Sequence, residues 1–356
     1  MSGGANRFGE RFQITTFGES HGVALGVVID GCPAGVPWDE RVLVRALERR
    51  RPGQKLTTSR GESDQPEVLS GVYEGKTLGT PIAILTRNHD ARSEDYQKVA
   101  KKPRTGHADD VWKLKFDHSD PRGGGRSSGR ETVARVMAGA VAEMFCRSFY
   151  PQMKVLGLAT EIAGVKLASD LSERWIKRLD SRKKTDALDA LRAEVDSAVV
   201  RFPADSRAQA KVSRLLQAAK ESGKSYGGRA WIQCSGVPAG LGQPVFYKFK
   251  SEWARALLSV GATATVEIGE GSRAVEAEGS QFHREGKNGR YGGIRGGITT
   301  GEILQASVGF KPTSSVLDVA KQGRHDPCIV PRAIPVLEAM TWCLLADQIL
   351  WARGDR

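Results

Sequence analysis

Two histidines stand beside glycine in short polar segments, and imidazole is the side chain best able to exchange protons near neutral pH. His21 lies in Gly18-Glu-Ser-His-Gly22, and His107 lies in Arg104-Thr-Gly-His-Ala-Asp109. His21 could reach a ligand from an open turn, or it could be a turn histidine held by backbone hydrogen bonds. His107 stands near arginine and could act as a general acid toward a phosphate, although an ordinary exposed loop histidine is the simpler interpretation. Spacing alone does not show whether the fold joins the two.

A third segment, 122–131, reads Arg-Gly-Gly-Gly-Arg-Ser-Ser-Gly-Arg-Glu and runs into a predicted helix. Free N–H groups at a helix start, two hydroxyls and flanking guanidiniums together form an anion cradle. The segment matches neither a Walker A loop nor the GxGxxG pattern. A flexible turn with a helix cap is the alternative, and the three arginines favour anion binding over it.

Other basic or glycine-rich segments give weaker indications of the same chemistry. The run 49–55 reads Arg-Arg-Arg-Pro-Gly-Gln-Lys, and its cations by default complement a helix C-terminus; phosphate, carboxylate or nucleic-acid contact are the competing interpretations. Three short polar loops follow late in the chain, at 292–297, 311–315 and 323–328. Each alone is a weak signal, and what they share is suitability for small anions.

The elements that must position these segments mix helices and strands without a Rossmann alternation. Helices are predicted from Pro37 to Pro52, over 132–149 behind a Ser128–Glu131 capping box, and over the apolar C-terminal stretch 336–351 that follows Pro335. Strands are predicted at 12–17, 25–30, 68–73, 81–86 (with a turn at 74–76), 229–235, 263–268 and 303–310. Glycine nearly vanishes over 171–222, where helical periods appear at 187–200 and 208–219. We expect one α/β (α+β) domain over 1–356, with a mainly helical, charged segment at 171–222.

Composition limits the partners. The 356 residues carry a net charge of +12, which favours an anionic partner: nucleic acid, an anionic membrane or a small polyanion. Only 7% of residues are aromatic and no nucleic-acid motif is present. Five dispersed cysteines without a CxxC pair suggest neither disulfides nor a zinc site and suit a reducing compartment. With no apolar leader and no span long enough for a bilayer, we expect a cytoplasmic protein and no bound metal.

Taken in order, these segments resemble the chorismate synthase family over nearly the whole chain. Ten stretches carry the resemblance: RFQITTFGESHGVALGVVIDGCPAG, RRRPGQ, GTPIAILTRNHDARSEDY, TGHAD, RGGGRSSGRET, SGVPAGLGQPVF, VEIGEG, GGIRGGI, KPTSS and GRHDPCIVPRAIPVLEAM.

The resemblance implies a β-α-β sandwich, a homotetramer, and reduced FMN as an obligatory cofactor that is not consumed overall. The implied reaction is a 1,4-anti elimination from 5-enolpyruvylshikimate 3-phosphate, which loses its phosphate and a C6 proton to give chorismate in aromatic amino acid biosynthesis. A substrate with two carboxylates and a phosphate requires a dense Arg/Lys site, which explains part of the positive charge without nucleic acid. Some members reduce flavin with NADPH, but no dinucleotide fingerprint occurs here, so an external reductant is expected.

Residue roles follow from the resemblance, position by position. His21 would keep the flavin correctly protonated, His107 would protonate the departing phosphate, and Asp326 with Ser20 would help move the C6 proton through flavin N5. Flavin contacts would come from Arg126, Ser127, Ser128, Gly261, Ala262, Gly296, Lys311, Pro312, Thr313, Ser314, Ser315 and Arg324. Substrate anions would meet Arg50, Lys55, Arg104 and Arg130.

The chain departs from the family pattern at several positions. Gly261 replaces an asparagine, so only backbone can contact flavin there, and Lys55 matches the expected arginine only with one residue missing. Thr105, Gln243 and Tyr247 replace a proline, a glutamate and an aspartate. The stretches before Gly292 and between Ser315 and Gly323 are shorter than in many relatives. Two rival functions remain: a basic nucleic-acid-binding protein, and a flavin-independent phosphate-ester enzyme on the same fold.

Overall fold

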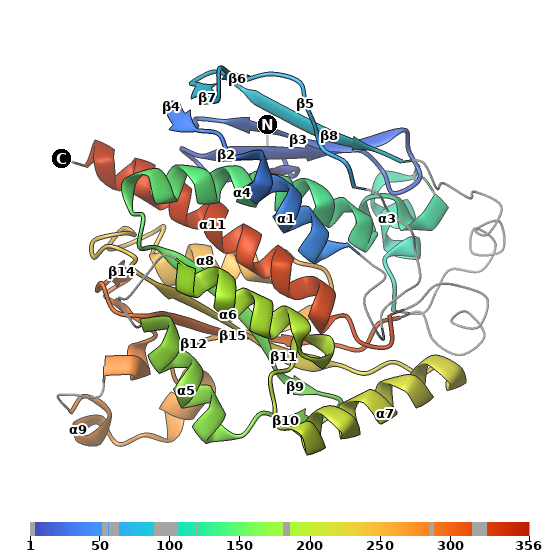
Figure 1. Ribbon diagram of the computed structural model, residues 1–356, viewed down its shortest axis with the longest axis vertical. Coiled ribbons are helices and arrows are strands. Elements are labelled where there is room, and N and C mark those ends of the chain that lie inside the picture. Colours follow the sequence, from blue (N-terminus) through green and yellow to red (C-terminus); the bar gives the residue numbers. More distant parts are fainter. Residues whose placement is uncertain are drawn as a thin grey trace.

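A computed structural model describes residues 4–51, 56, 64–88, 106–118, 120, 122–180, 186–284, 288–314 and 326–355. Four of the predicted site residues, Lys55, Arg104, Ser315 and Arg324, lie outside these ranges. Two five-stranded antiparallel sheets enclose a layer of helices (Figure 1). This arrangement confirms the predicted α/β class and the β-α-β sandwich.

The first sheet has the strand order β1-β2-β3-β8-β5 and carries the His21 turn between its second and third strands. The strands are β1 (Arg7–Phe8), β2 (Gln13–Phe17), β3 (Ala24–Asp30), β8 (Ile82–Arg87) and β5 (Glu67–Val68). A smaller sheet of β4 (Ala34–Pro37), β7 (Lys76–Leu78) and β6 (Val72–Tyr73) adjoins it. Apolar residues at alternate positions, such as Val27 and Ile29, are fully buried against the helices.

The predicted strand 68–73 is wrong, because the chain divides there into β5 and β6. Gly71 lies between them with φ +83°, and a Cβ at this position would come within 2.6 Å of the Ile82 side chain. The left-handed backbone at Gly71 therefore separates β5 from β6. The predicted turn at 74–76 is real but shorter, since Lys76 already begins β7.

The second sheet has the order β10-β9-β11-β15-β12. Its strands are β9 (Lys154–Ile162), β10 (Val165–Lys166), β11 (Gly228–Ser235), β15 (Leu304–Phe310) and β12 (Thr263–Ile268). The last three confirm the predicted strands to within one residue. A separate hairpin is formed by β13 (Ile294–Arg295) and β14 (Ile298–Thr299).

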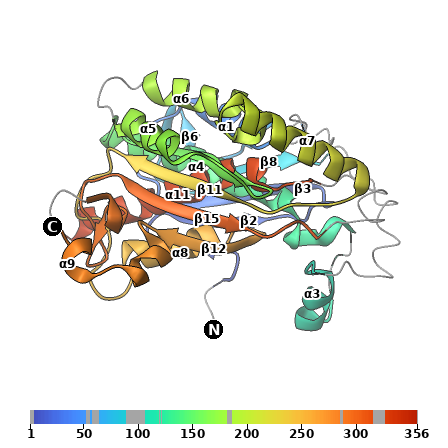
Figure 2. The same ribbon diagram turned by 90° about the horizontal axis from the view of Figure 1, so that it is seen from below.

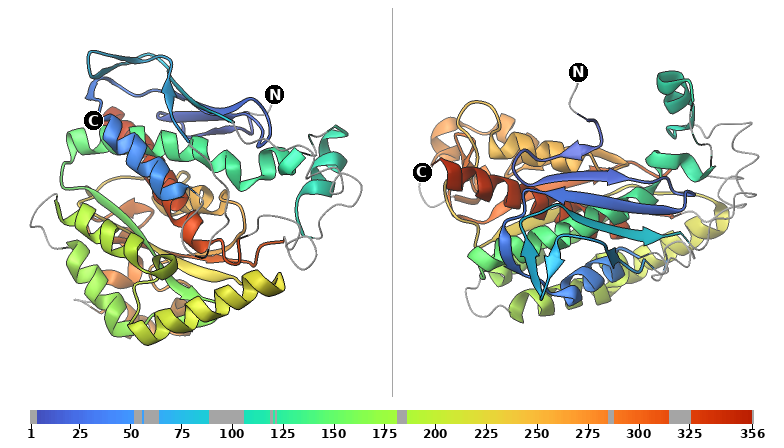
Figure 3. Two further views of the ribbon diagram at one scale, coloured as in Figure 1. Left: turned by 45° about the vertical axis from the view of Figure 1, so that its right-hand side comes forward. Right: turned by 90° about the horizontal axis from the view of Figure 1, so that it is seen from above.

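The helix layer is built on two long helices that lie between the sheets (Figure 3). Helix α4 (Thr132–Phe149) packs on the first sheet and α11 (Val330–Gly354) on the second, while α1 (Glu40–Arg50) contacts both helices and α8 (Phe249–Leu258) fills the space between α11 and β12. The apolar window of α11 would suffice for a membrane span by length and composition, but 94% of it is buried inside the protein. We conclude that α11 is a core helix, as its sequence predicts.

Three further helices, α5 (Ser169–Asp180), α6 (Asp186–Ser197) and α7 (Ser206–Ser222), lie to one side of the second sheet (Figure 2). Asp205 begins α7 by accepting the backbone N–H of Ala208 at 2.9 Å, and Gly223 ends it in a left-handed conformation. The number of domains stays a prediction. The remaining helical turns are α3 (Asp109–Phe116), α9 (Gly279–Phe282), η2 (Arg122–Ser127), η3 (Gly129–Glu131), η4 (Val199–Arg201), η5 (Gly271–Glu276) and η6 (Asn288–Tyr291).

The starts of α4 and α11 differ from those predicted from the sequence. The Ser128 hydroxyl accepts the Arg130 N–H (3.3 Å) and so caps the single 3-10 turn η3, while Glu131 pairs with Arg135 (2.9 Å) instead of closing a capping box. Helix α11 begins at Val330 and contains Pro335, which the sequence placed before the helix.

Gly139 sets how closely α4 and α11 approach. A Cβ there would lie 2.4 Å from the Cβ of Ala339 and 2.5 Å from its Cα, so backbone would have to move. We predict that Gly139→Ala lowers the free energy of unfolding by about 1–3 kcal/mol despite its better helix propensity, because overpacking outweighs that gain. Urea unfolding measures this. Gly354→Ala is the control, since a Cβ there meets nothing within 4 Å; equal stability of the two variants would contradict the prediction.

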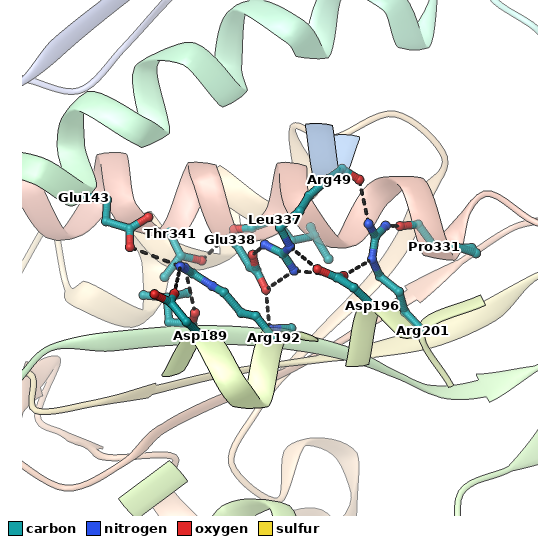
Figure 4. Close-up of polar contacts among 12 residues, drawn as sticks. Arg49, Glu143, Asp189, Arg192, Asp196, Arg201, Pro331, Leu337, Glu338 and Thr341 are labelled. Carbon is teal, nitrogen blue, oxygen red and sulfur yellow. Dashed lines mark hydrogen bonds and ion pairs between the residues drawn. The ribbon is translucent and has the colours of Figure 1, made fainter. Parts of the chain in front are cut away.

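Ion pairs occupy the space between α1, α4, α6 and α11 (Figure 4). Burial penalises the charged form of Glu143, yet its bonded partner Arg192 (3.2 Å) outweighs that effect, and the pKa of Glu143 lies below its usual value. The pKa of Asp196 is lowered in the same way, because Arg49 and Arg201 outweigh its burial. Carboxylates with depressed pKa stabilise the fold above their unfolded-state pKa, near 4, and this contribution is lost as pH falls through the folded-state pKa.

We therefore predict that the melting temperature of the wild type falls steeply below about pH 4. A double variant, Glu143→Gln with Arg192→Met, removes one of the titrating pairs and should lose less stability over the same range. Melting curves between pH 7 and pH 3 test this. Parallel curves for the two proteins would show that this pair does not contribute to acid unfolding.

Candidate active site

The His21 turn joins β2 to β3 and contacts the glycine-arginine loop 122–131, in which Arg122 lies 102 residues after Ser20. The Ser20 hydroxyl lies 3.0 Å from His21 Nδ1 and donates to the carbonyl of Arg122 at 3.2 Å. The Ser20 backbone N–H donates to the Gly125 carbonyl at 3.4 Å. Because the hydroxyl has one hydrogen, donation to Arg122 fits a ring protonated at Nδ1 that donates to Ser20. Nε2 is then the acceptor atom of the neutral ring.

Arg126, a predicted flavin residue, is held in place by the strand before the His21 turn. Its guanidinium donates to the Thr16 hydroxyl at 2.6 Å and to the carbonyls of Thr16 and Gly18, each at 3.2 Å. Ser127 donates to the Gly124 carbonyl (2.8 Å) within the loop. The loop and β2 therefore form one surface with a fixed cation.

The predicted substrate residues Arg50 and Arg130 lie at the later part of the same loop, and both are buried. The two guanidiniums bind opposite oxygens of Asp64, Arg50 at Oδ2 (2.7 Å) and Arg130 at Oδ1. Arg50 also donates to the carbonyl of Gly129 at 3.1 Å. Arg130 Nε donates to the Asn88 side-chain oxygen at 3.1 Å.

Sequence reasoning missed Asp64 and Asn88. Asn88 immediately follows a strand and falls in one of the segments that carry the family resemblance, so a signal was present. Asp64 had no local signal, because nothing in its neighbours indicates that Arg50 and Arg130 meet there.

A second cluster contains His107, Lys311 and Asp326. The Lys311 ammonium donates to the carbonyl of Gly106, the residue before His107, at 3.1 Å. Thr313 donates its hydroxyl to the Asp326 carbonyl at 3.0 Å, and the Lys311 N–H donates to the Ala262 carbonyl at 3.0 Å. The fold thus joins the 106–107, 261–262, 311–314 and 326 positions that lie far apart in the sequence.

Asp326 itself is nearly buried and pairs with Arg332 at 2.7 Å, in the first turn of α11. Gly296 lies elsewhere, in the β13–β14 turn, whose next residue Gly297 accepts the N–H of Phe249 at 2.8 Å. The hydrogen bonds of this turn do not connect it to either cluster among the described residues.

Both clusters lie at the N-terminal ends of long helices. The first precedes α4 and the second precedes α11, and these ends point to the same side of the molecule (Figure 1). Arg201 joins the chain beside each cluster, because its guanidinium donates to the carbonyl of Arg49, next to Arg50, and to that of Pro331, in the first turn of α11 (Figure 4). Helix N-termini carry partial positive charge, which adds to the arginines and lysine to favour anions here.

Comparison with known proteins decides the family. The sequence model described as chorismate synthase matches residues 12–350. The chain belongs to the chorismate synthase family. It is 57% identical to the chorismate synthase of Bdellovibrio bacteriovorus over 99% of both chains, and 40% identical to that of Synechocystis over 97% of both.

A solved structure titled "Crystal Structure of Chorismate Synthase" superposes with a TM-score of 0.75 at 29% identity, covering 97% of this chain and 93% of that one. These findings confirm the predicted family, the fold class and a lyase of chorismate biosynthesis. The nucleic-acid-binding alternative is not favoured.

Proposed function

We propose that this chorismate synthase performs a reduced-FMN-dependent 1,4-anti elimination of phosphate from 5-enolpyruvylshikimate 3-phosphate. The observation that carries the proposal is that two histidine segments, buried arginines and a lysine lie at the same end of the helix layer. A trianionic substrate needs such a set of cations, and an elimination needs a proton donor and a proton acceptor.

The residues around the second cluster fit a flavin. A Cβ at Gly261 would meet nothing within 4 Å, so open space adjoins the backbone, and Ala262 has a left-handed φ of +68°. The exposed Lys311 ammonium and the hydroxyls of Thr313 and Ser314 suit the flavin's polar edge and phosphate. Reduced FMN would be held by these residues with Arg126, Ser127 and Ser128. When bound, it supplies transient electron donation to the breaking C–O bond.

Side chains of the protein would supply and move the protons. The bond from C3 to the phosphate oxygen breaks, and His107 gives its proton to the departing phosphate. The C6–H bond breaks, its electron pair forms a new ring double bond, and the existing ring double bond shifts toward C3 as the phosphate leaves. Asp326, with Ser20, would help move the C6 proton. His21, which contacts the Ser20 hydroxyl, would keep the flavin correctly protonated. Arg50 and Arg130 bind the substrate anions.

We also propose a homotetramer in the cytoplasm that depends on an external source of reduced flavin. Support comes from the family resemblance and from the absence of a dinucleotide fingerprint in the sequence.

The cofactor requirement is tested under anaerobic conditions. We predict that the purified chain forms chorismate from 5-enolpyruvylshikimate 3-phosphate only when reduced FMN is present, because the C–O bond needs the flavin's electron density to break. Product is measured with and without reduced FMN. Equal rates in both would support a flavin-independent enzyme and contradict the proposal.

The role of His107 is tested by His107→Ala. We predict a fall in kcat of roughly 10²–10⁴-fold, the usual loss when a general acid is removed. His283→Ala is the matched control. His283 is exposed, and its ring packs against Phe282 and Tyr291, which belong to neither cluster. Unchanged kcat in His107→Ala would show that His107 is an ordinary loop residue.

A further inference from the structure

Among the described residues, two side chains that have no role in the proposed reaction hold Arg130. Its Nε donates to Asn88 Oδ1 at 3.1 Å, and its terminal nitrogen pairs with Asp64. We propose that Asn88 and Asp64 are positioning residues that fix Arg130 and couple it to the His21 turn. This inference rests on the proposed function, in which Arg130 binds a substrate anion.

Asn88 reaches the His21 turn with the other end of its amide. Nδ2 donates to the carbonyl of Gly22 at 2.8 Å and lies 3.3 Å from that of Ser20, the residues on either side of His21. The backbone N–H of Asn88 donates to the Val23 carbonyl at 3.0 Å. An amide side chain carries both an N–H donor for carbonyls and an oxygen acceptor for a guanidinium. Asn88 therefore links the backbone that orients His21 to Arg130.

Asp64 sets the spacing of the two arginines. Its side chain is fully buried, with Arg50 on one oxygen and Arg130 on the other. One carboxylate between two guanidiniums reduces their mutual repulsion and holds them at a fixed spacing. Asp64 also has a left-handed φ of +44°, which a residue other than glycine keeps only where its surroundings demand it.

The burial of Asp64 argues against its acting as a substitute for a substrate anion. To act in that way, the Asp64 side chain would have to leave when the substrate binds to Arg50 and Arg130. It would then have to move out of a fully enclosed position. With both oxygens bound to arginine, Asp64 instead belongs to the frame behind the anion site. The arrangement thus runs from Arg50 through Asp64, Arg130 and Asn88 to the His21 turn.

The two positions make separable contributions, which isosteric variants can distinguish. Asn88→Asp keeps an oxygen for Arg130 but turns a carboxylate toward the carbonyls of the His21 turn. Asp64→Asn keeps the shape but removes the charge between the arginines. Gln13→Glu is the matched control, because Gln13 accepts from Arg7 (3.3 Å) and donates to the Glu10 carbonyl (2.8 Å) at the far end of β2.

The experiment measures kcat and KM of each variant with reduced FMN under anaerobic conditions, together with its melting temperature. We expect Asn88→Asp to lower kcat by about tenfold or more with KM within about threefold, since small misplacements of catalytic groups can cost roughly 10²-fold. We expect Asp64→Asn to raise KM by about tenfold with a smaller change in kcat. Gln13→Glu should match the wild type in both constants.

The outcomes divide cleanly. If both variants match Gln13→Glu while the wild type is active, or if Asp64→Asn lowers KM, the positioning roles are overturned. If Asp64→Asn does not fold, Asn88→Asp and the double variant Asp64→Asn with Arg50→Met, which removes one of the two cations that Asp64 separates, keep the test decisive. If the wild type makes no chorismate, the proposed function fails; calorimetric binding of 5-enolpyruvylshikimate 3-phosphate to the same variants then tests the positioning of Arg130 without turnover.

Discussion

A single guanidinium, that of Arg201, joins the end of α1 to the start of α11, and the site depends on that junction. Pro335 has no N–H, so the Pro331 carbonyl one turn earlier in α11 lacks its helical donor. Arg201 donates to this carbonyl, to that of Arg49, and to Asp196 at 2.6 Å. A buried carbonyl without a donor would cost about 1–3 kcal/mol. Pro335 in a core helix is thus compatible with the fold because Arg201 replaces the missing bond.

The same junction aligns the two groups of functional residues. Arg50 follows the carbonyl that Arg201 binds on α1, and Asp326 precedes the one that it binds on α11. Carboxylates set the remaining cations: Arg49 pairs with Glu338 and Asp196, whereas Arg50 and Arg130 share Asp64. A net charge of +12, which by composition suggests nucleic acid, is here partly organised into a compact, buried set suited to a small polyanion.

Much of this could be predicted where local pattern and tertiary environment agree. The helix 132–149 and the strand 263–268 have the predicted bounds, because the local preferences of these segments agree with the places that the fold gives them. Prediction failed where a distant residue decided the outcome: Arg201 allows Pro335 inside α11, and Ile82 forbids a side chain at Gly71. The individual site segments can be recognised in the sequence. The roles of Asp64 and Asn88 cannot, because they depend on partners 14 to 68 residues away.

We propose that loops at one end of the helix layer form a single site in which flavin and substrate bind side by side. The most direct test of this proposal is the absorbance spectrum of FMN mixed with the purified chain as 5-enolpyruvylshikimate 3-phosphate is added. We predict a saturable change in the flavin spectrum that requires both protein and substrate, because an anion bound next to the ring alters its environment. A flavin spectrum that stays the same at saturating substrate would contradict the account.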